Sequence, residues 1–171
     1  MKRGLKKCAY CLTYQKVKAR KGKKVFCSQE HKQAYYDNDI PTLKKEIQIE
    51  FNRMVTEAQP CAVCGKKFEK MDCSHILSRG GHDHLRFDIL NVLPMCSRCH
   101  RWFWHDDPLK AMEWFKAKYP ERYDYLMFAD KQFKSWTTDE LRQIREVIEK
   151  KEVKKLIRFY EEYRLATQKE E

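Results

Sequence analysis

Glycine and proline are scarce in this chain, with five of each among 171 residues, and 36% of the residues are charged. This composition excludes collagen-like and low-complexity chains and predicts a folded protein. Long apolar runs are also missing, since no stretch approaches the roughly 18 residues that span a bilayer, and no apolar segment follows the basic N-terminus. We therefore expect a soluble, cytoplasmic protein with no membrane partner.

Acidic residues are nearly absent from residues 1–35, which contain one acidic residue, Glu30, and eleven Lys or Arg. The net charge of this segment is +10, whereas the other 136 residues carry +1. A basic segment of this kind binds polyanions by releasing their counterions, so nucleic acid is the expected partner; the alternative is a solvated tail. The expected phosphate contacts in this segment are Lys6, Lys7, Arg20, Lys21, Lys23 and Lys24.

Cysteine is abundant, and its spacing indicates zinc rather than disulfides. Residues 1–36 predict an N-terminal zinc-binding basic module with a hairpin through residues 21–24 and a short helix capped by Ser28. This segment has too few large apolar residues to fold without metal, and the alternative is unpaired cysteines in a disordered arm. The expected zinc ligands are Cys8, Cys11, Cys27 and His31.

A second set of four cysteines is the strongest signal in the sequence. Two Cys-x2-Cys pairs lie 31 residues apart, and Gly65 follows the first pair. They predict a closed structural zinc site that folds residues 65–95 into a compact hairpin and places His100 at the start of a helix. Its ligands are Cys61, Cys64, Cys96 and Cys99.

Apolar periodicity predicts helices on both sides of this central module, which spans residues 60–105. A connecting helix is expected within 37–59, with Leu43, Ile47, Phe51, Val55 and Ala58 on its apolar face. The helical tail, 106–171, should contain a helix entered at Pro108 and a second over 121–133. A capping box at 137–140 should open one long helix to about residue 165, which is expected to pack or to form a dimer interface.

Several polar side chains of the central module are not needed for zinc. An aspartate and two histidines suit a divalent cation, and a further histidine can take a proton from water. On a regular strand Asp72 and His75 would face opposite sides, so we expect a bulge or turn between them. Trp102, Phe103 and Trp104 are expected to pack against the following helix. The polar candidates are Asp72, His75, His82, His84, Asn91, His100 and His105.

The central pattern resembles a known family. Cys-x2-Cys, Asp-x-x-His-Ile, a glycine-containing loop, Asn-Val-Leu-Pro-Met and Cys-x2-Cys-His are similar to the HNH, or ββα-metal, endonucleases. The chain resembles most the phage NinG/Rap recombination proteins, and more distantly the endonuclease VII nucleases. The Leu85-Arg86-Phe87 stretch and the Trp136-Thr137 step extend the resemblance over nearly the whole chain.

The resemblance implies an α+β fold, with a small zinc-stapled ββα-metal core between the N-terminal zinc module and the helical tail. It implies that His75 is the general base and that Asn91 helps to orient it. Asp72 and His100 would hold the catalytic ion, Mg²⁺ or Mn²⁺, in addition to two structural zinc ions. Close relatives have asparagine where this chain has His100, so the preferred ion stays open.

The function implied is a metal-dependent DNA endonuclease acting on branched recombination intermediates such as Holliday junctions or D-loops. Cutting two opposed strands requires two sites, so a homodimer is expected. Two alternatives stay open: a general nicking or restriction-like HNH endonuclease, and a non-catalytic zinc-finger DNA-binding protein. Arginines around the candidate site are expected to contact phosphates: Arg79, Arg86, Arg98 and Arg101.

Overall fold

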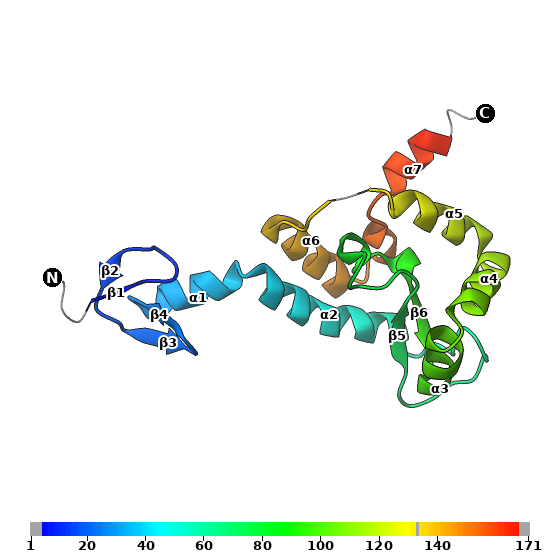
Figure 1. The fold of residues 1–171 in the computed structure, drawn as a ribbon, viewed down its shortest axis with the longest axis horizontal. Helices are drawn as coiled ribbons and strands as arrows, with labels where there is room; N and C mark the ends of the chain where they lie inside the picture. The colour runs from blue at the N-terminus through cyan, green and yellow to red at the C-terminus, as the bar shows by residue number, and fades with distance from the viewer. Residues whose placement is uncertain (1–4, 133, 168–171) are drawn as a thin grey trace.

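The computed structural model describes residues 5–132 and 134–167. In Figure 1 a small N-terminal unit is joined by helices α1 (Gln29–Asp37) and α2 (Ile40–Thr56) to a larger body of mixed strands and helices. Phe133, which was expected in a tail helix, lies outside the described residues. Residues 1–4 of the expected N-terminal module and residues 168–171 of the expected tail also lie outside them. Within the described residues, no helix combines the length and the apolar character that crossing a membrane requires.

The N-terminal unit folds around its own small core. Strand β1 (Lys6–Lys7) pairs with β2 (Tyr14–Gln15), and β3 (Ala19–Lys21) pairs with β4 (Lys24–Phe26). The hairpin expected through 21–24 is confirmed, and Gly22 supplies the positive φ of 56° in its turn. The Ser28 cap is confirmed too, because its hydroxyl accepts from the His31 amide at 3.1 Å. The buried apolar residues of this unit, Cys8, Ala19 and Phe26, form a cluster of their own.

Helix α2 carries the expected apolar face into the larger body. The Asp39 carboxylate caps it by accepting from the Thr42 amide at 3.2 Å. The face is confirmed for its first four members, Leu43, Ile47, Phe51 and Val55, all of which are buried. Ala58 was wrongly placed on it, since the helix ends at Thr56 and Ala58 adopts a left-handed φ of 56°.

The central module is a two-stranded antiparallel hairpin followed by a short helical segment. Strand β5 (Asp72–His75) pairs with β6 (Val92–Met95), and the loop between them holds two short 3-10 helices, η1 (Asp83–Leu85) and η2 (Ile89–Asn91). Helix α3 (Ser97–Cys99) continues directly into a π-helical turn, η3 (His100–His105). Successive residues of β6 point to opposite faces of the hairpin. Val92 belongs to one hydrophobic cluster and Leu93 to another, so both faces are covered.

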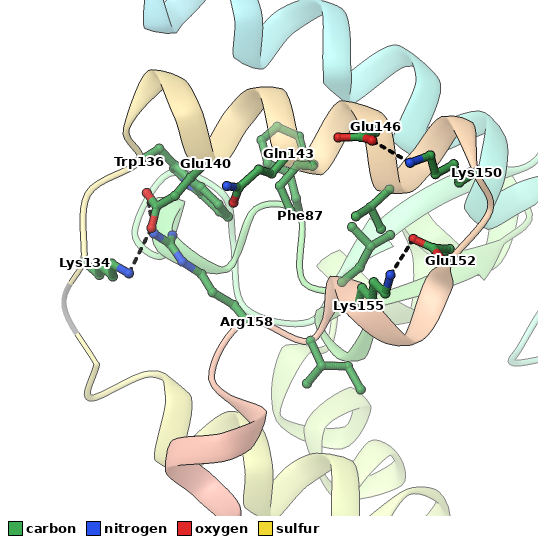
Figure 2. A pocket seen from close by; sticks show the side chains of 14 residues that line it. Phe87, Lys134, Trp136, Glu140, Gln143, Glu146, Lys150, Glu152, Lys155 and Arg158 are labelled. Atoms are coloured by element: carbon green, nitrogen blue, oxygen red, sulfur yellow. Dashed lines mark hydrogen bonds and ion pairs between the residues drawn. The ribbon is translucent and has the colours of Figure 1, made fainter.

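One hydrophobic cluster contains Val92 of the hairpin together with α2 and the tail. Its aromatic centre is Phe87, whose ring lies 5.8 Å from Phe51 and 5.5 Å from Trp136. The Arg158 guanidinium stacks on Trp136 at 3.4 Å from the ring centroid. Figure 2 shows Phe87, Trp136 and Arg158 lining a pocket of about 450 Å³.

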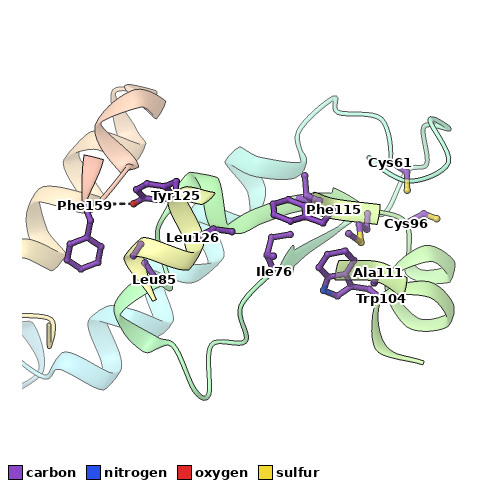
Figure 3. Packing of buried hydrophobic residues seen from close by; sticks show 13 residues of the cluster. Cys61, Ile76, Leu85, Cys96, Trp104, Ala111, Phe115, Tyr125, Leu126 and Phe159 are labelled. Carbon is purple, nitrogen blue, oxygen red and sulfur yellow. Dashed lines mark hydrogen bonds between the residues drawn. The ribbon is translucent and has the colours of Figure 1, made fainter. Parts of the chain in front are cut away.

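The second cluster contains Leu93 and Met95 of the hairpin together with the first helices of the tail. Figure 3 shows Cys61 and Cys96 at one end of this cluster and Phe159 at the other. The buried Asp88 carboxylate fixes the tail to the hairpin loop, since it accepts from the Tyr125 hydroxyl and from the Arg158 amide. Burial raises the pKa of Asp88 above its ordinary value, and these donors oppose that shift.

The tail contains α4 (Pro108–Lys118), α5 (Pro120–Ala129), α6 (Thr138–Glu149), η4 (Val153–Leu156) and α7 (Tyr160–Thr167). The expected start of α4 is confirmed, with Asp107 as its cap and Pro108 in the first position. The capping box is confirmed as well: Thr137 and Glu140 exchange side-chain to backbone bonds at 3.2 and 2.9 Å. The second helix is shorter than expected, ending at Ala129.

The prediction of one long helix to residue 165 is wrong. Helix α6 ends at Glu149, and Lys151 adopts a left-handed φ of 54°. The amide of Glu152 donates to the Val147 carbonyl and that of Lys151 to Ile148, both at 3.0 Å, which is the bond pattern of a Schellman cap. The apolar stripe of α6 packs against α2 in the same chain, so it is core.

Lys151→Gly is expected to raise the free energy of unfolding by about 1 kcal/mol. A residue with a Cβ is strained in the left-handed conformation, whereas glycine is not. The preceding residue gives a matched control, because Lys150 has a right-handed φ of −79° and Lys150→Gly should be destabilising. Urea unfolding of the two variants measures both effects. Equal destabilisation by both glycines would contradict the assignment of strain to Lys151.

Candidate active site and metal centres

The four expected ligands of the first zinc site converge as predicted and could hold the ion. The ligand atoms of Cys8, Cys11, Cys27 and His31 all lie within 4.8 Å of one another. Cys27 Sγ is 2.9 Å from His31 Nδ1 and 3.8 Å from Cys11 Sγ. Burial alone would raise the pKa of Cys8, but backbone hydrogen bonds outweigh it and lower the pKa to about 6, which favours the thiolate that zinc binds.

The four expected ligands of the second zinc site also converge. The sulfur atoms of Cys61, Cys64, Cys96 and Cys99 lie within 4.8 Å of one another. Gly65 makes the first knuckle turn with a φ of 71°, and its amide donates to the Cys61 carbonyl at 2.8 Å. Four converging thiols and no open position suit structural zinc, so this set could staple the hairpin to α3.

Strand β5 does not contain the expected bulge. Its four residues pair in unbroken register with β6, from Asp72 opposite Met95 to His75 opposite Val92. Asp72 and His75 therefore alternate onto opposite faces of the hairpin. Among the described residues, the groups of three or more His, Cys, Asp or Glu side chains that converge on one point are the two zinc sets. The three residues expected around the catalytic ion thus do not form one compact ligand group.

The structure does bring Asp72 and His100 together. Asp72 Oδ2 lies 3.1 Å from His100 Nδ1, and His100 Nε2 lies 3.0 Å from His105 Nε2. The π-helical turn brings this second histidine alongside the first, since the two rings are 4.7 Å apart. Residues five apart do not share a face of a regular α-helix, so the π turn that brings them together is a feature that the sequence did not reveal.

His75 lies against the loop on the other face. Its Nε2 is 2.9 Å from the Arg86 carbonyl oxygen. Because a carbonyl only accepts, Nε2 carries the proton and Nδ1 keeps its lone pair. Burial lowers the pKa of His75 to about 4; the Arg86 carbonyl opposes this shift, and the charges of Arg79, Arg86 and His100 reinforce it. The imidazole is therefore neutral at pH 7 and free to accept a proton at Nδ1.

Asn91 braces the backbone around His75 without a hydrogen bond to its ring. Its side-chain oxygen accepts from the Leu77 amide at 2.8 Å, and its amide nitrogen donates to the Leu77 and Leu85 carbonyls at 3.1 Å. Leu77 follows β5 and Leu85 precedes Arg86, so the fully buried Asn91 links the strand that carries His75 to the loop that binds it. Any orientation of His75 by Asn91 acts through this backbone.

Trp104 connects the π turn to the same strand. Its buried indole donates from Nε1 to the His75 carbonyl at 3.1 Å. Phe103 also packs, with its ring 5.6 Å from Trp114. The expectation that Trp102 packs likewise is wrong, since 66% of its surface is exposed.

The two other histidines of the central loop have structural contacts. His84 is buried, with Nε2 3.2 Å from the Ala129 carbonyl. His82 lies 3.1 Å from the Asp130 carboxylate. Both therefore join the loop to the end of α5.

Most of the expected phosphate-binding cations are exposed. Lys6, Lys7, Arg20 and Lys23 are open to solvent and form no ion pair within the described residues, whereas Lys21 and Lys24 lie over the rings of Tyr36 and Tyr35. Arg79, Arg98 and Arg101 are also exposed. Arg86 differs, because its guanidinium is half-buried and bonded to Asp83 at 2.8 Å.

A groove lined in part by Arg86, whose carbonyl accepts from His75, combines cationic and apolar side chains with the Asp83 carboxylate. It has a volume of about 680 Å³ and runs between α2 and the loop after β5. Lys45 and Arg79 contribute charge, and Ile49 is 66% exposed. The pocket in Figure 2 lies elsewhere, since none of the predicted site residues lines it.

Comparison with known proteins gives one match. No curated protein and no solved structure matches the chain significantly. A family model described as the bacteriophage lambda NinG protein matches residues 36–159, from the end of α1 to the start of the last helix. This match covers more than half of the chain and includes the hairpin, the second cysteine set and the first tail helices. The chain therefore belongs to the bacteriophage lambda NinG family.

Proposed function

We propose that this protein is a DNA endonuclease that hydrolyses phosphodiester bonds. The observation that carries the proposal is the geometry of His75, whose Nε2 donates to the Arg86 carbonyl so that Nδ1 keeps its lone pair, while burial lowers its pKa to about 4. Such an imidazole can take a proton from the water that attacks phosphorus. Among the residues that the structure describes, none hydrogen-bonds to Nδ1.

The surroundings of His75 suit a phosphodiester. Arg79 and Arg86 both place positive charge near the imidazole, and both line the groove between α2 and the loop after β5, together with Lys45. A phosphate there would meet cations, and His75 would stay neutral for its role as base. A divalent cation bound at His100, whose charge also acts on His75, would further stabilise the charge that develops on the phosphate oxygens.

We further propose that the substrate is branched DNA, such as a four-way junction. Membership of the NinG family and the earlier resemblance to phage recombination proteins support this choice. The test compares a labelled four-way junction with a linear duplex of the same sequence, at equal salt and with Mg²⁺ or Mn²⁺. Cleavage of the junction at a higher rate supports branched-DNA specificity, and equal rates favour a general nicking enzyme.

A second candidate is a DNA-binding protein without catalysis. It is favoured by the separation of Asp72 and His75 onto opposite faces of an unbroken hairpin. Absence of cleavage on both substrates, with binding retained, would favour this candidate.

The exposed cations of the N-terminal unit should make DNA binding steeply dependent on salt. Each phosphate contact contributes about 0.9 to the slope of log K against log salt. Replacing Lys6, Lys7, Arg20 and Lys23 with glutamine should therefore reduce the slope by about 3 to 4. The matched control replaces four tail lysines, Lys116, Lys150, Lys151 and Lys155, with the same change in net charge. Equal slopes for both variants would contradict a DNA-binding role for the N-terminal unit.

A further inference from the structure

The π-helical turn η3 places two histidines in a geometry that a regular helix does not provide. In an α-helix, residues five apart point about 140° away from each other. The wider π turn, with its i to i+5 repeat, brings them onto one side. His100 and His105 begin and end this turn, and their rings lie 4.7 Å apart.

Asp72 determines which nitrogen of His100 faces its neighbour. The carboxylate lies 3.1 Å from His100 Nδ1 and can only accept, so Nδ1 carries the proton. Nε2 of His100 then has a lone pair, and it lies 3.0 Å from Nε2 of His105. Two such nitrogens can approach this closely with a proton between them or with a cation bound to both.

We propose that His100 Nε2 and His105 Nε2 together bind a divalent transition-metal ion, and that Asp72 positions His100 instead of contacting the ion. Two imidazole ligands at 2.0–2.1 Å from one ion, at right or tetrahedral angles, have nitrogens about 2.8–3.4 Å apart. The observed 3.0 Å lies within this range. A carboxylate behind a ligating histidine fixes its orientation and raises its basicity.

The site is open to solvent and is connected to His75. His105 is exposed and the His100 side chain is 27% exposed, so water or a phosphate oxygen can complete the coordination. Trp104, within the same turn, donates to the His75 carbonyl at 3.1 Å. The turn that carries the ion is thus tied to the strand that carries the base. The role of this ion in cleavage rests on the proposed function, whereas its binding does not.

The donor set predicts which ions bind. Two imidazoles without a direct carboxylate suit Ni²⁺, Co²⁺ and Zn²⁺, with Mn²⁺ weaker and Mg²⁺ weakest. If Asp72 were instead a direct ligand of Mg²⁺, the site should prefer Mg²⁺ and Mn²⁺ over Ni²⁺. Metal binding without DNA therefore separates the two arrangements.

The test is calorimetric titration of Ni²⁺ into the full chain after both cysteine sets have been loaded with zinc. The wild-type protein should bind one further ion. His105→Ala should weaken binding at least tenfold, and Asp72→Asn should weaken it about 10–100-fold without changing the stoichiometry. His82→Ala is the matched control, because that histidine lies outside the turn, and it should bind as the wild type does. Zinc content and the unfolding midpoint of each variant verify folding.

Three results would overturn the inference. The first is no binding of Ni²⁺ beyond the two zinc sites in the wild type. The second is unchanged affinity in His105→Ala. The third is Mg²⁺ binding more tightly than Ni²⁺, with loss of all binding in Asp72→Asn, which would make Asp72 the ligand. Because these titrations contain no DNA, their outcome does not depend on the nuclease proposal. The cleavage assay on the four-way junction tests that proposal separately.

Discussion

His75→Ala is expected to lower the rate of DNA cleavage by about 10²–10⁴-fold, the usual contribution of a general base. The side chain is half-buried, and its ring makes one hydrogen bond, to the Arg86 carbonyl. The fold, the two zinc sites and DNA binding should therefore persist in the variant. Single-turnover cleavage of a four-way junction gives the rate, and gel-shift titration gives the affinity.

The pH dependence of cleavage provides an independent readout of the same base. An ordinary histidine, with a pKa of about 6.5, would be about nine-tenths protonated at pH 5.5 and unable to act as base. Burial lowers the pKa of His75 to about 4, so the neutral imidazole is retained as the pH falls to 5.5 and is lost only near pH 4. Cleavage that falls tenfold between pH 7 and 5.5, with zinc retained and the divalent cation kept saturating at both pH values, would remove His75 as the base. His82→Ala serves as a control, with an unchanged rate.

Cys96→Ser is expected to abolish cooperative folding of the larger body. Cys61 and Cys96 are both buried in the cluster that contains Trp104 and Phe115. Binding of structural zinc is typically worth about 10–16 kcal/mol, which equals or exceeds the whole stability of a domain. The central hairpin has only two strands, so its own pairing cannot replace the staple. Zinc content should fall from two ions to at most one per chain, and the thermal transition of the larger body should disappear.

Two other cysteines provide the matched comparisons. Cys11→Ser should release the first zinc and unfold the N-terminal unit alone, because that unit has its own hydrophobic cluster. Cys73 belongs to neither zinc set, and burial raises its pKa to about 12. Cys73→Ser should therefore keep both zinc ions and the thermal transition. An unchanged transition in Cys96→Ser would contradict the role of the second cysteine set.

The features that could be predicted from the sequence are those with local causes. Cys-x2-Cys and Cys-x3-His spacing predicted both ligand sets, because ligands with two or three residues between them can share a turn. The capping box at Thr137 and the Asp107-Pro108 step predicted where α6 and α4 begin, because each depends on side chains within one turn.

The features that could not be predicted depend on packing between distant segments. Lys151 ends α6 in a conformation that usually requires glycine, and no glycine or proline marks the position. The π turn lets His100 and His105 meet, although their spacing excludes this in an α-helix. The carbonyl that accepts from His75 belongs to Arg86, eleven residues away, and only the loop braced by Asn91 brings it there.

Side-chain NMR of ¹⁵N-labelled histidine tests the central claim most directly, since the claim is that the fold keeps His75 as a neutral imidazole with its proton on Nε2. His75→Gln assigns the signal. The expected spectrum has a protonated Nε2 and an unprotonated Nδ1 for His75, unchanged from pH 7 to 5.5. An imidazolium signal that titrates near pH 6.5, or a proton on Nδ1, would contradict the proposed base.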